Sequence, residues 1–171
     1  VNGNLNPDLE ALWPDFRGNR DNNGVTDAPT PIRDEEAVLY WATKLGEGYS
    51  AGATGCPILA GGSLYTYAGT DIYRMDPFTG EILTQAPMDH ASSFAINNPT
   101  YAEGMIFVGL SNGCIQAFDA QTLQSLWLYQ DALGGQPNCP IVYHDGYLYT
   151  GFWNSETGLA NYVCLTVTDE D

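Results

Sequence analysis

The sequence is poor in basic residues. It contains five lysines and arginines against 21 aspartates and glutamates, which gives a formal net charge of −16. A chain of this charge repels the phosphate backbone of nucleic acids and the surface of anionic membranes, so we expect neither as a partner. The acidic excess is typical of an exported protein that charge keeps soluble, and it also favours the attraction of cations.

Long apolar runs are absent as well. No stretch approaches the roughly 18 residues that a membrane-spanning helix requires, so we expect no membrane insertion. No signal peptide is visible, as in a mature exported protein whose leader has been removed. Hydrophobic residues still make up 44% of the chain and aromatic residues 12%, which argues against disorder and indicates one substantial core.

Histidine and paired cysteines are scarce. The two histidines, His90 and His144, fall in predicted connections, and neither stands near a serine or cysteine nucleophile in a recognisable activating motif. We interpret both as solvated turn residues and assign no catalytic residue. No two cysteines form a CxxC motif, so the sequence gives no support for a zinc or redox motif.

A repeat with a period of about 42 residues dominates what is present. Three sets of residues recur at this spacing: turn glycines (Gly62, Gly104, Gly146), strand aromatics (Tyr65, Phe107, Tyr149) and leading prolines (Pro57, Pro99, Pro140). A period in the forties, with turn glycines and β-type residues, is the pattern of a propeller blade in which each repeat forms one four-stranded sheet. The sequence therefore predicts an all-β chain.

Each repeat reads as a hairpin followed by further strands. A short apolar run, a glycine turn and a second β-rich run form the hairpin, and a third strand and an Asp-x-x-Thr turn follow. Ala37–Ala42 matches the fourth strand of a blade whose first three strands are not seen. We thus expect an extension over 1–36 and a partial propeller over 37–171. Its expected parts are a strand at 37–43, blades at 50–87 and 93–130, and a three-stranded partial blade at 137–167.

Several motifs resemble those of a known family. The run Trp13-Pro-Asp-Phe-Arg-Gly-Asn19, the turn Asn22-Asn-Gly24 and the repeated blades are similar to secreted bacterial PQQ-like β-propellers, named for quinoprotein alcohol dehydrogenases. The resemblance implies the fold, but most members with such repeats bind no quinone. Members that bind PQQ use a vicinal disulfide and a calcium ion, and the sequence shows neither pattern. We therefore expect no quinone cofactor and no enzyme activity.

Three blades are fewer than the 4 to 8 that usually close a propeller. Such an arc has two uncovered flanks, so we expect a piece of a longer polypeptide or a subunit that another chain completes. The start at Val1 and the acidic end Thr168–Asp171 are consistent with processing. In the alternative, Leu39, Tyr40 and Trp41 form an assembly strand that completes a blade of a neighbouring copy, giving a ring or a filament.

The four cysteines, Cys56, Cys114, Cys139 and Cys164, allow three disulfide pairings. Cys56 and Cys139 occupy equivalent positions two blades apart, too far for a disulfide to bridge. Cys114 and Cys164 fall on third strands of neighbouring blades at positions that do not match. We favour buried free thiols.

One segment partly imitates a calcium loop. Asn19, Asp21, Asn23 and Asp27 surround Gly24 with side-chain oxygens, but Thr30 stands where the bidentate acidic ligand belongs. A polar turn is the preferred interpretation, and calcium is the weaker one.

The third repeat carries an insertion, Phe152–Asn161, between its second and third strands. Loops that outgrow those of sibling repeats often bind ligands. Trp153, flanked by Asn154 and Glu156, is a candidate aromatic platform with polar rims for a sugar or a peptide. In the alternative, Trp153 packs against the next blade.

The expected function is that of a non-catalytic binding or assembly module, extracellular or at the bacterial cell surface. Its partners would be the remaining blades of the propeller or another copy of the chain, with a glycan or a peptide as ligand. The competing class is an enzyme, either a PQQ-type oxidoreductase or a hydrolase that uses the rest of the ring.

Overall fold

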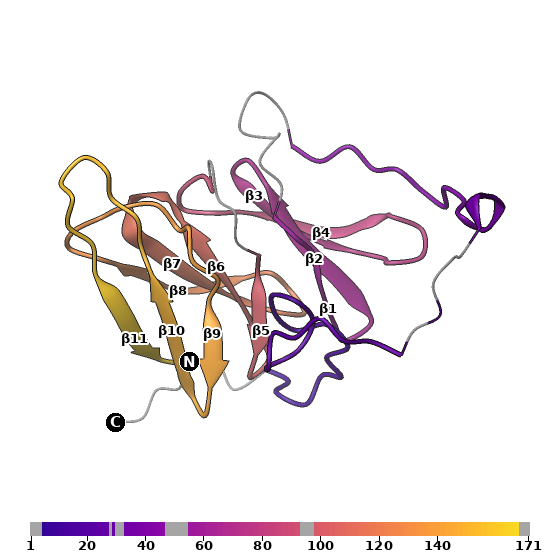
Figure 1. Cartoon of the computed structure of the whole chain (residues 1–171), viewed down its shortest axis with the longest axis horizontal. Coiled ribbons are helices and arrows are strands. Elements are labelled where there is room, and N and C mark those ends of the chain that lie inside the picture. The colour runs from indigo at the N-terminus through magenta and orange to yellow at the C-terminus, as the bar shows by residue number, and fades with distance from the viewer. Residues whose placement is uncertain (1–4, 28, 30–32, 47–54, 93–97, 168–171) are drawn as a thin grey trace.

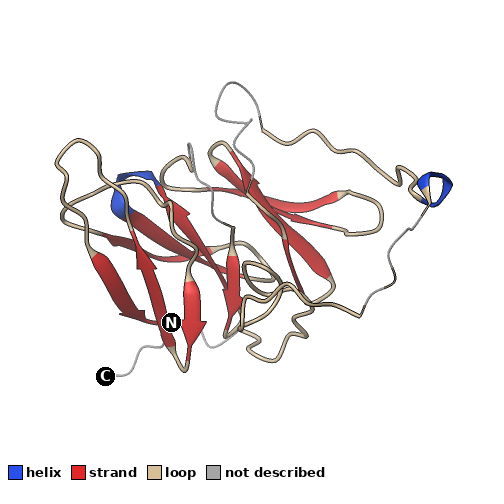
Figure 2. Ribbon diagram, in the orientation of Figure 1, coloured by secondary structure: helices blue, strands red, loops and turns tan. Residues whose placement is uncertain are grey.

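The computed structural model describes residues 5–27, 29, 33–46, 55–92 and 98–167 of the chain. Within these residues the chain forms three antiparallel sheets in which every strand pairs with its neighbour in sequence. Figures 1 and 2 show the sheets standing side by side, with the second sheet between the first and the third. The all-β partial propeller predicted from the repeat is confirmed.

The three sheets follow the predicted repeats, and each is called a blade here. Blade one contains β1 (Ile58–Ala60), β2 (Ser63–Ala68), β3 (Asp71–Met75) and β4 (Ile82–Pro87). Blade two contains β5 (Thr100–Ala102), β6 (Met105–Leu110), β7 (Cys114–Asp119) and β8 (Ser125–Gln130). Blade three contains β9 (Val142–His144), β10 (Tyr147–Gly151) and β11 (Tyr162–Thr166). Two short 3-10 turns are described, η1 (Asp34–Glu36) and η3 (Ser111–Gly113).

The repeated glycines close the first hairpin of each blade. Gly62, Gly104 and Gly146 have φ values of +71°, +77° and +83°, in the left-handed region where glycine is favoured. Each therefore permits the tight reversal that the sequence pattern predicts.

The Asp-x-x-Thr turns also form as expected. Oδ1 of Asp76 accepts hydrogen bonds from the backbone amides of Phe78 and Thr79, at 2.8 and 2.9 Å. Asp119 does the same one blade later, with Gln121 and Thr122, at 2.8 Å each. The carboxylates thus supply acceptors for backbone amides that the turn leaves without a backbone partner.

Blade two is covered on both faces. All six residues of β6 are buried, because one face packs in the apolar layer shared with blade one and the other in the layer shared with blade three. Between blades two and three the rings of Phe107 and Trp127 lie 5.7 Å apart. Polar contacts also cross the layers, since Tyr65 donates to the carbonyl of Ala120 at 2.5 Å and Thr100 to that of Ile141 at 3.0 Å.

The N-terminal extension packs across the blades. Trp13 forms a backbone bridge with Leu59 of β1. Arg20 donates to Asp15 Oδ2 at 2.6 Å and to the carbonyl of Tyr101 at 2.8 Å. The guanidinium of Arg20 also lies 4.8 Å from the ring centre of Tyr143, so one side chain connects the extension with blades two and three.

The predicted strand at 37–43 does not form. The segment is assigned no strand, yet it keeps the alternation of one, with Trp41, Thr43 and Leu45 directed at blade one. Trp41 Nε1 donates to the carbonyl of Pro77 at 3.0 Å, and Thr43 Oγ1 to that of Gly80 at 2.7 Å. An extended segment becomes a strand only when a neighbouring strand bonds to its backbone, and none of the described residues supplies that neighbour here.

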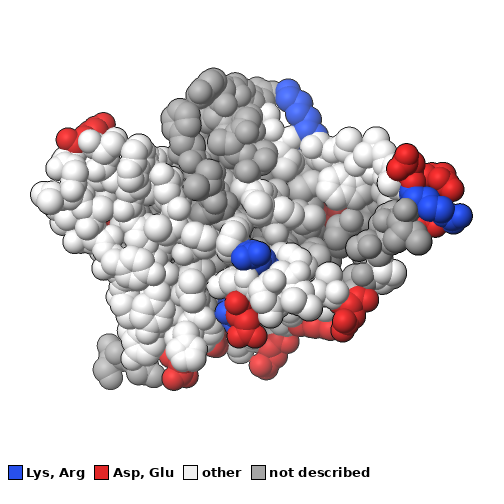
Figure 3. All heavy atoms as spheres, viewed as in Figure 1, with Lys and Arg blue, Asp and Glu red and all other residues white. Residues whose placement is uncertain are grey.

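Acidic side chains are spread over the surface seen in Figure 3, where they gather at η1 and along the edge by the N-terminal extension. No helix among the described residues is long and apolar enough to cross a membrane.

Candidate functional site

A cleft of about 560 Å³ opens where three loops of blades two and three meet. It is lined by η3, by the segment from Leu133 to Asn138 that leads into blade three, and by residues 153–157 of the insertion between β10 and β11. The segment predicted to bind a ligand therefore forms one wall of a real concavity, of a size common for ligand sites.

Asp131 holds the segments that carry two walls of this cleft, although it does not line the cleft itself. Its buried carboxylate accepts hydrogen bonds from the amide of Leu133 at 2.9 Å, from Tyr129 Oη at 3.0 Å and from Asn161 Nδ2 at 2.9 Å. Burial of the carboxylate acts to raise its pKa, but these donors, led by Asn161, outweigh that effect and lower the pKa below its ordinary value. The carboxylate thus stays ionised and holds β8, the 131–138 segment and the start of β11 together.

The insertion is joined to the opposite wall through backbone bonds. Gln136 and Trp153 exchange both of their peptide hydrogen bonds, at 2.7 and 2.9 Å. A β-carbon on Gly135 would lie 3.0 Å from the carbonyl oxygen of Trp153, so glycine permits this close approach. Trp153 is 54% exposed, so the described residues leave about half of this residue uncovered.

Asn154 shapes the insertion from within. Its Oδ1 accepts from the amides of Glu156 and Thr157, at 3.1 and 3.2 Å, and its Nδ2 donates to the carbonyl of Leu133 at 2.8 Å. This is the same turn that Asp76 and Asp119 form in the other blades. The amide of Asn154 is engaged within the protein, so its position favours a structural role over direct contact with a ligand.

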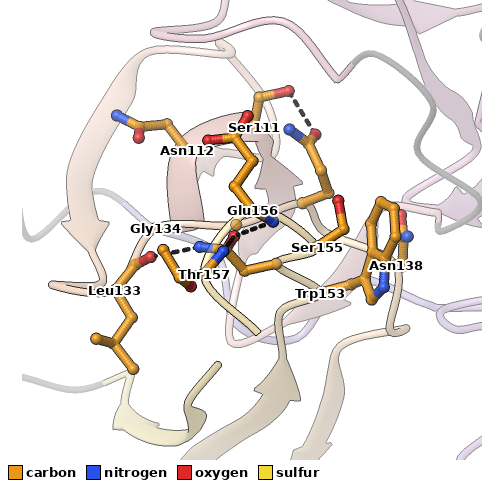
Figure 4. A pocket seen from close by; sticks show the side chains of 12 residues that line it. Ser111, Asn112, Leu133, Gly134, Asn138, Trp153, Ser155, Glu156 and Thr157 are labelled. Atoms are coloured by element: carbon orange, nitrogen blue, oxygen red, sulfur yellow. Dashed lines mark hydrogen bonds between the residues drawn. The ribbon is translucent and has the colours of Figure 1, made fainter. Parts of the chain in front are cut away.

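Two other polar residues line the cleft without such engagement. Asn138 Oδ1 is buried and has no hydrogen-bond partner among the described residues. Glu156 is exposed, and no ion pair or hydrogen bond of its carboxylate is found within the described residues. Figure 4 shows the indole of Trp153 beside Asn138, and the Glu156 side chain reaching across the cleft toward Ser111. The sequence did not indicate Asn138, because no motif surrounds it and its position depends on how blade three packs on blade two.

A second hollow of about 370 Å³ lies under the N-terminal extension, between Trp13, Phe16 and Pro57. Asp15 and Asn98 line it, and the buried Oδ1 of each lacks a hydrogen-bond partner within the part of the chain that the structure describes. Burial raises the pKa of Asp15, and the adjacent Arg20 counteracts this by favouring the charged form.

The calcium candidates lie in an exposed turn of the extension. Asn23 Oδ1 accepts from Asn19 Nδ2 at 2.7 Å and from the amide of Val25 at 3.0 Å, so these side chains bond within the turn itself. Asp21 and Asp27 are exposed. In the part of the chain that the structure describes, no three His, Cys, Asp or Glu side chains gather closely enough to hold a metal ion.

The histidines and cysteines are dispersed. His90 lies 3.5 Å from Asp89 Oδ2 in a connection after β4, and His144 is exposed at the end of β9. All four cysteines are free, but the expectation that they are buried is right only for Cys114, since Cys139 is half-buried and Cys56 and Cys164 are exposed. Cys56 precedes the first strand of blade one, and Cys164 points to the outer face of blade three; neither surface is covered within the described residues.

That outer face of blade three is an open apolar surface. Its alternate residues include Val142, Tyr147 and Tyr162, which are 37, 41 and 74% exposed, and Cys164. The opposite face of the same sheet carries Leu148, which is buried against blade two. Blade two has a neighbouring sheet on each side, whereas none of the described residues forms a sheet over this face of blade three.

Comparison with known proteins agrees with this architecture. A family model described as outer membrane protein assembly factor BamB matches residues 33–156. No curated protein matches the chain significantly.

Solved structures show the same fold at low identity. The quinohemoprotein alcohol dehydrogenase ADHIIG from Pseudomonas putida HK5 is 17% identical and superposes with a TM-score of 0.73 over 91% of this chain and 25% of its own. The quinohemoprotein alcohol dehydrogenase from Comamonas testosteroni is 16% identical, with a TM-score of 0.61 over 81% of this chain and 23% of its own. A europium-containing methanol dehydrogenase is 20% identical, with a TM-score of 0.54 over 72% and 25%. The chain spans about a quarter of the length of these relatives.

Proposed function

The chain belongs to the β-propeller family described as outer membrane protein assembly factor BamB, and on that premise we propose that it is a non-catalytic binding and assembly module of the cell envelope. The observation that carries the proposal is the open apolar face of blade three. The family name, the acidic surface and the loop cleft support the same interpretation.

The open face has the chemistry of a protein contact. A large apolar side chain gains about 1.5–3 kcal/mol when it moves from full exposure to full burial. Tyr162 at 74% exposure and Tyr147 at 41% therefore stand to gain a few kcal/mol together when another sheet covers them. Tyrosines are also enriched at protein interfaces, because the ring buries apolar area while the hydroxyl bonds at the rim. The proposed partner is a further sheet, from the same longer polypeptide or from another protein.

Self-assembly is the second candidate, and the segment 37–46 favours it. Trp41 is anchored on blade one, whereas Leu39 and Tyr40 are 83 and 87% exposed and lack a strand beside them. In a neighbouring copy, β11 forms an edge of a three-stranded sheet at the position where blades one and two have a fourth strand. Insertion of 37–43 beside that edge would join two copies head to tail, and two copies with three blades each would form a ring of six, within the usual range of about 4 to 8.

Sedimentation velocity tests the proposal on the chain and on the double variant Tyr147→Ser, Tyr162→Ser. The chain is expected to associate in a concentration-dependent manner and the variant to remain at 18.6 kDa. The matched control is Tyr40→Ser, which keeps the face of blade three. An equal loss of association in Tyr40→Ser would support self-assembly through the segment 37–46. In that case the natural chain should form a species of about twice the chain mass. An unchanged association in the double variant contradicts the role of the blade-three face.

The enzyme class is tested separately. Addition of PQQ is expected to leave the absorbance of the cofactor unchanged, because the proposal assigns no quinone site. A stoichiometric complex would contradict the non-catalytic assignment. The mass of the protein in its source cells separates a longer parent polypeptide from an 18.6 kDa product.

A further inference from the structure

We propose that the cleft between blades two and three is a receptor for an arginine side chain of an extended partner segment. The inference rests on the proposed binding function and names the chemistry that its loop cleft recognises. Two groups that line the cleft carry it: the exposed Trp153 and the exposed carboxylate of Glu156.

Trp153 provides the surface on which a cation is held. The residue is 54% exposed, while its backbone is fixed by the paired bonds to Gln136. The platform is therefore open but its base is rigid. Tryptophan is the side chain that attracts cations most strongly over its ring face, and arginine stacks on such faces because its guanidinium is planar.

Glu156 supplies the opposite charge. Its backbone amide is held by Asn154, which sets the turn, and its carboxylate reaches across the cleft, as Figure 4 shows. No lysine or arginine is among the described residues that line the cleft. A guanidinium that enters can thus pair with this carboxylate without competition from a cation of the same chain.

Asn138 belongs to the wall beside Trp153 and not to the contact surface, as Figure 4 shows. Its Oδ1 is buried and finds no hydrogen-bond partner within the described residues, so a ligand in the open cleft does not reach it. A guanidinium offers five N–H donors in one plane, enough to bond the Glu156 carboxylate while its face lies on the Trp153 ring. A sugar would also stack and donate to Glu156, but its neutral hydroxyls gain less from that charge than a guanidinium does.

The charge of the whole chain favours the same ligand. At −16, the protein attracts basic segments and raises their rate of association. Cleft chemistry and net charge therefore select a basic peptide over a neutral glycan.

The test uses the chain and the peptide acetyl-Gly-Arg-Gly-amide, with its citrulline counterpart as a neutral probe of the same shape. Binding is followed through the indole N–H signal of Trp153 in a nitrogen–proton correlation spectrum, assigned by its loss in Trp153→Phe. The arginine peptide is expected to shift this signal with a dissociation constant on the order of 1 mM, as suits one stacked and paired side chain. The citrulline peptide is expected to bind at least about fivefold more weakly.

Charge variants locate the effect. Glu156→Gln is expected to weaken the arginine peptide roughly tenfold, because it removes a charge-assisted hydrogen bond. Glu81→Gln removes the same charge from an exposed turn of blade one and is expected to change the affinity less than twofold. Equal binding of both peptides, or equal effects of the two variants, would overturn the proposal.

A third probe distinguishes the competing ligand. If chitotriose shifts the Trp153 signal while the arginine peptide does not, the cleft is a glycan site and the inference is wrong. Loss of association in the Tyr147 and Tyr162 variant leaves this test unaffected, because those residues lie on the outer face of blade three and not in the cleft. Failure of the arginine inference and failure of the proposed assembly function are thereby read separately.

Discussion

Replacement of Gly80 by alanine tests whether Trp41 is docked on blade one. A β-carbon at Gly80 would lie 2.4 Å from Cε3 of Trp41 and 2.7 Å from Oγ1 of Thr43. The backbone of Gly80 also has φ +71°, where alanine is disfavoured. The variant therefore strains its own turn and displaces the tryptophan that lies above it.

Gly62 allows the two costs to be separated. It has the same φ of +71°, but a β-carbon there would have nothing within 4 Å. Left-handed backbone costs alanine about 1–2 kcal/mol, which is the whole loss expected for Gly62→Ala. Truncation of a fully buried aromatic side chain costs about 3–5 kcal/mol of stability. Trp41 is only half-buried, so its displacement should cost a smaller part of that energy, about 1–2 kcal/mol. Gly80→Ala is thus expected to lower the free energy of unfolding by about 2–4 kcal/mol.

Urea unfolding followed by circular dichroism measures both variants. The excess loss in Gly80→Ala over Gly62→Ala should shrink when each is made in a Trp41→Ala background, because only the contact with Thr43 Oγ1 then remains. Equal losses in the two glycine variants of the natural chain would refute the docking of Trp41. The same result would remove the basis for an exposed edge at Leu39 and Tyr40.

Three further predictions follow from buried groups. Phe107→Ala is expected to destabilise the protein by about 3–5 kcal/mol in the same urea assay, since the side chain is fully buried between blades two and three. Folding lowers the pKa of Asp131. The ionised carboxylate therefore stabilises the folded protein above its ordinary pKa of 3.8, and this contribution is lost as the pH falls through the lowered pKa. The urea midpoints of the natural chain and of Asp131→Asn should therefore converge in acid. A thiol reagent is expected to modify Cys56 and Cys164 in the folded protein but Cys114 only after unfolding, because burial excludes the reagent and raises the pKa of the Cys114 thiol.

The blades were predictable because their signals are local. A hairpin glycine at 62, 104 and 146 and an aspartate that caps its own turn act within a few residues, so the printed sequence already contains their cause. The strand predicted around Trp41 failed for the opposite reason. Its alternation is local and does appear in the structure, but strand formation depends on a partner that the described residues do not provide.

The candidate site was predictable only in part. The greater length of the third insertion indicated Trp153 and Glu156, which do line the cleft. The sequence suggested Asn154 as a ligand-binding residue, whereas in the structure its side-chain amide closes a turn like those of Asp76 and Asp119. All three residues stand three positions before a threonine, and this shared spacing is the signal that predicts the turn. The position of Asn138 in the cleft wall depends on how blades two and three pack, and no short sequence motif encodes that packing.

The contacts of the N-terminal extension impose an order on the assembly of the molecule. Within the sheets, every strand bonds to its neighbour along the chain, so each blade can form as soon as its own segment is available. The extension is different, because Tyr101 donates to the carbonyl of Pro7 across 94 positions and Arg20 reaches Tyr101 across 81. The extension therefore completes its docking only after Tyr101 has been synthesised, 81 positions after Arg20 and 94 after Pro7. Until then the extension can hold only to blade one, through the backbone bridge between Trp13 and Leu59.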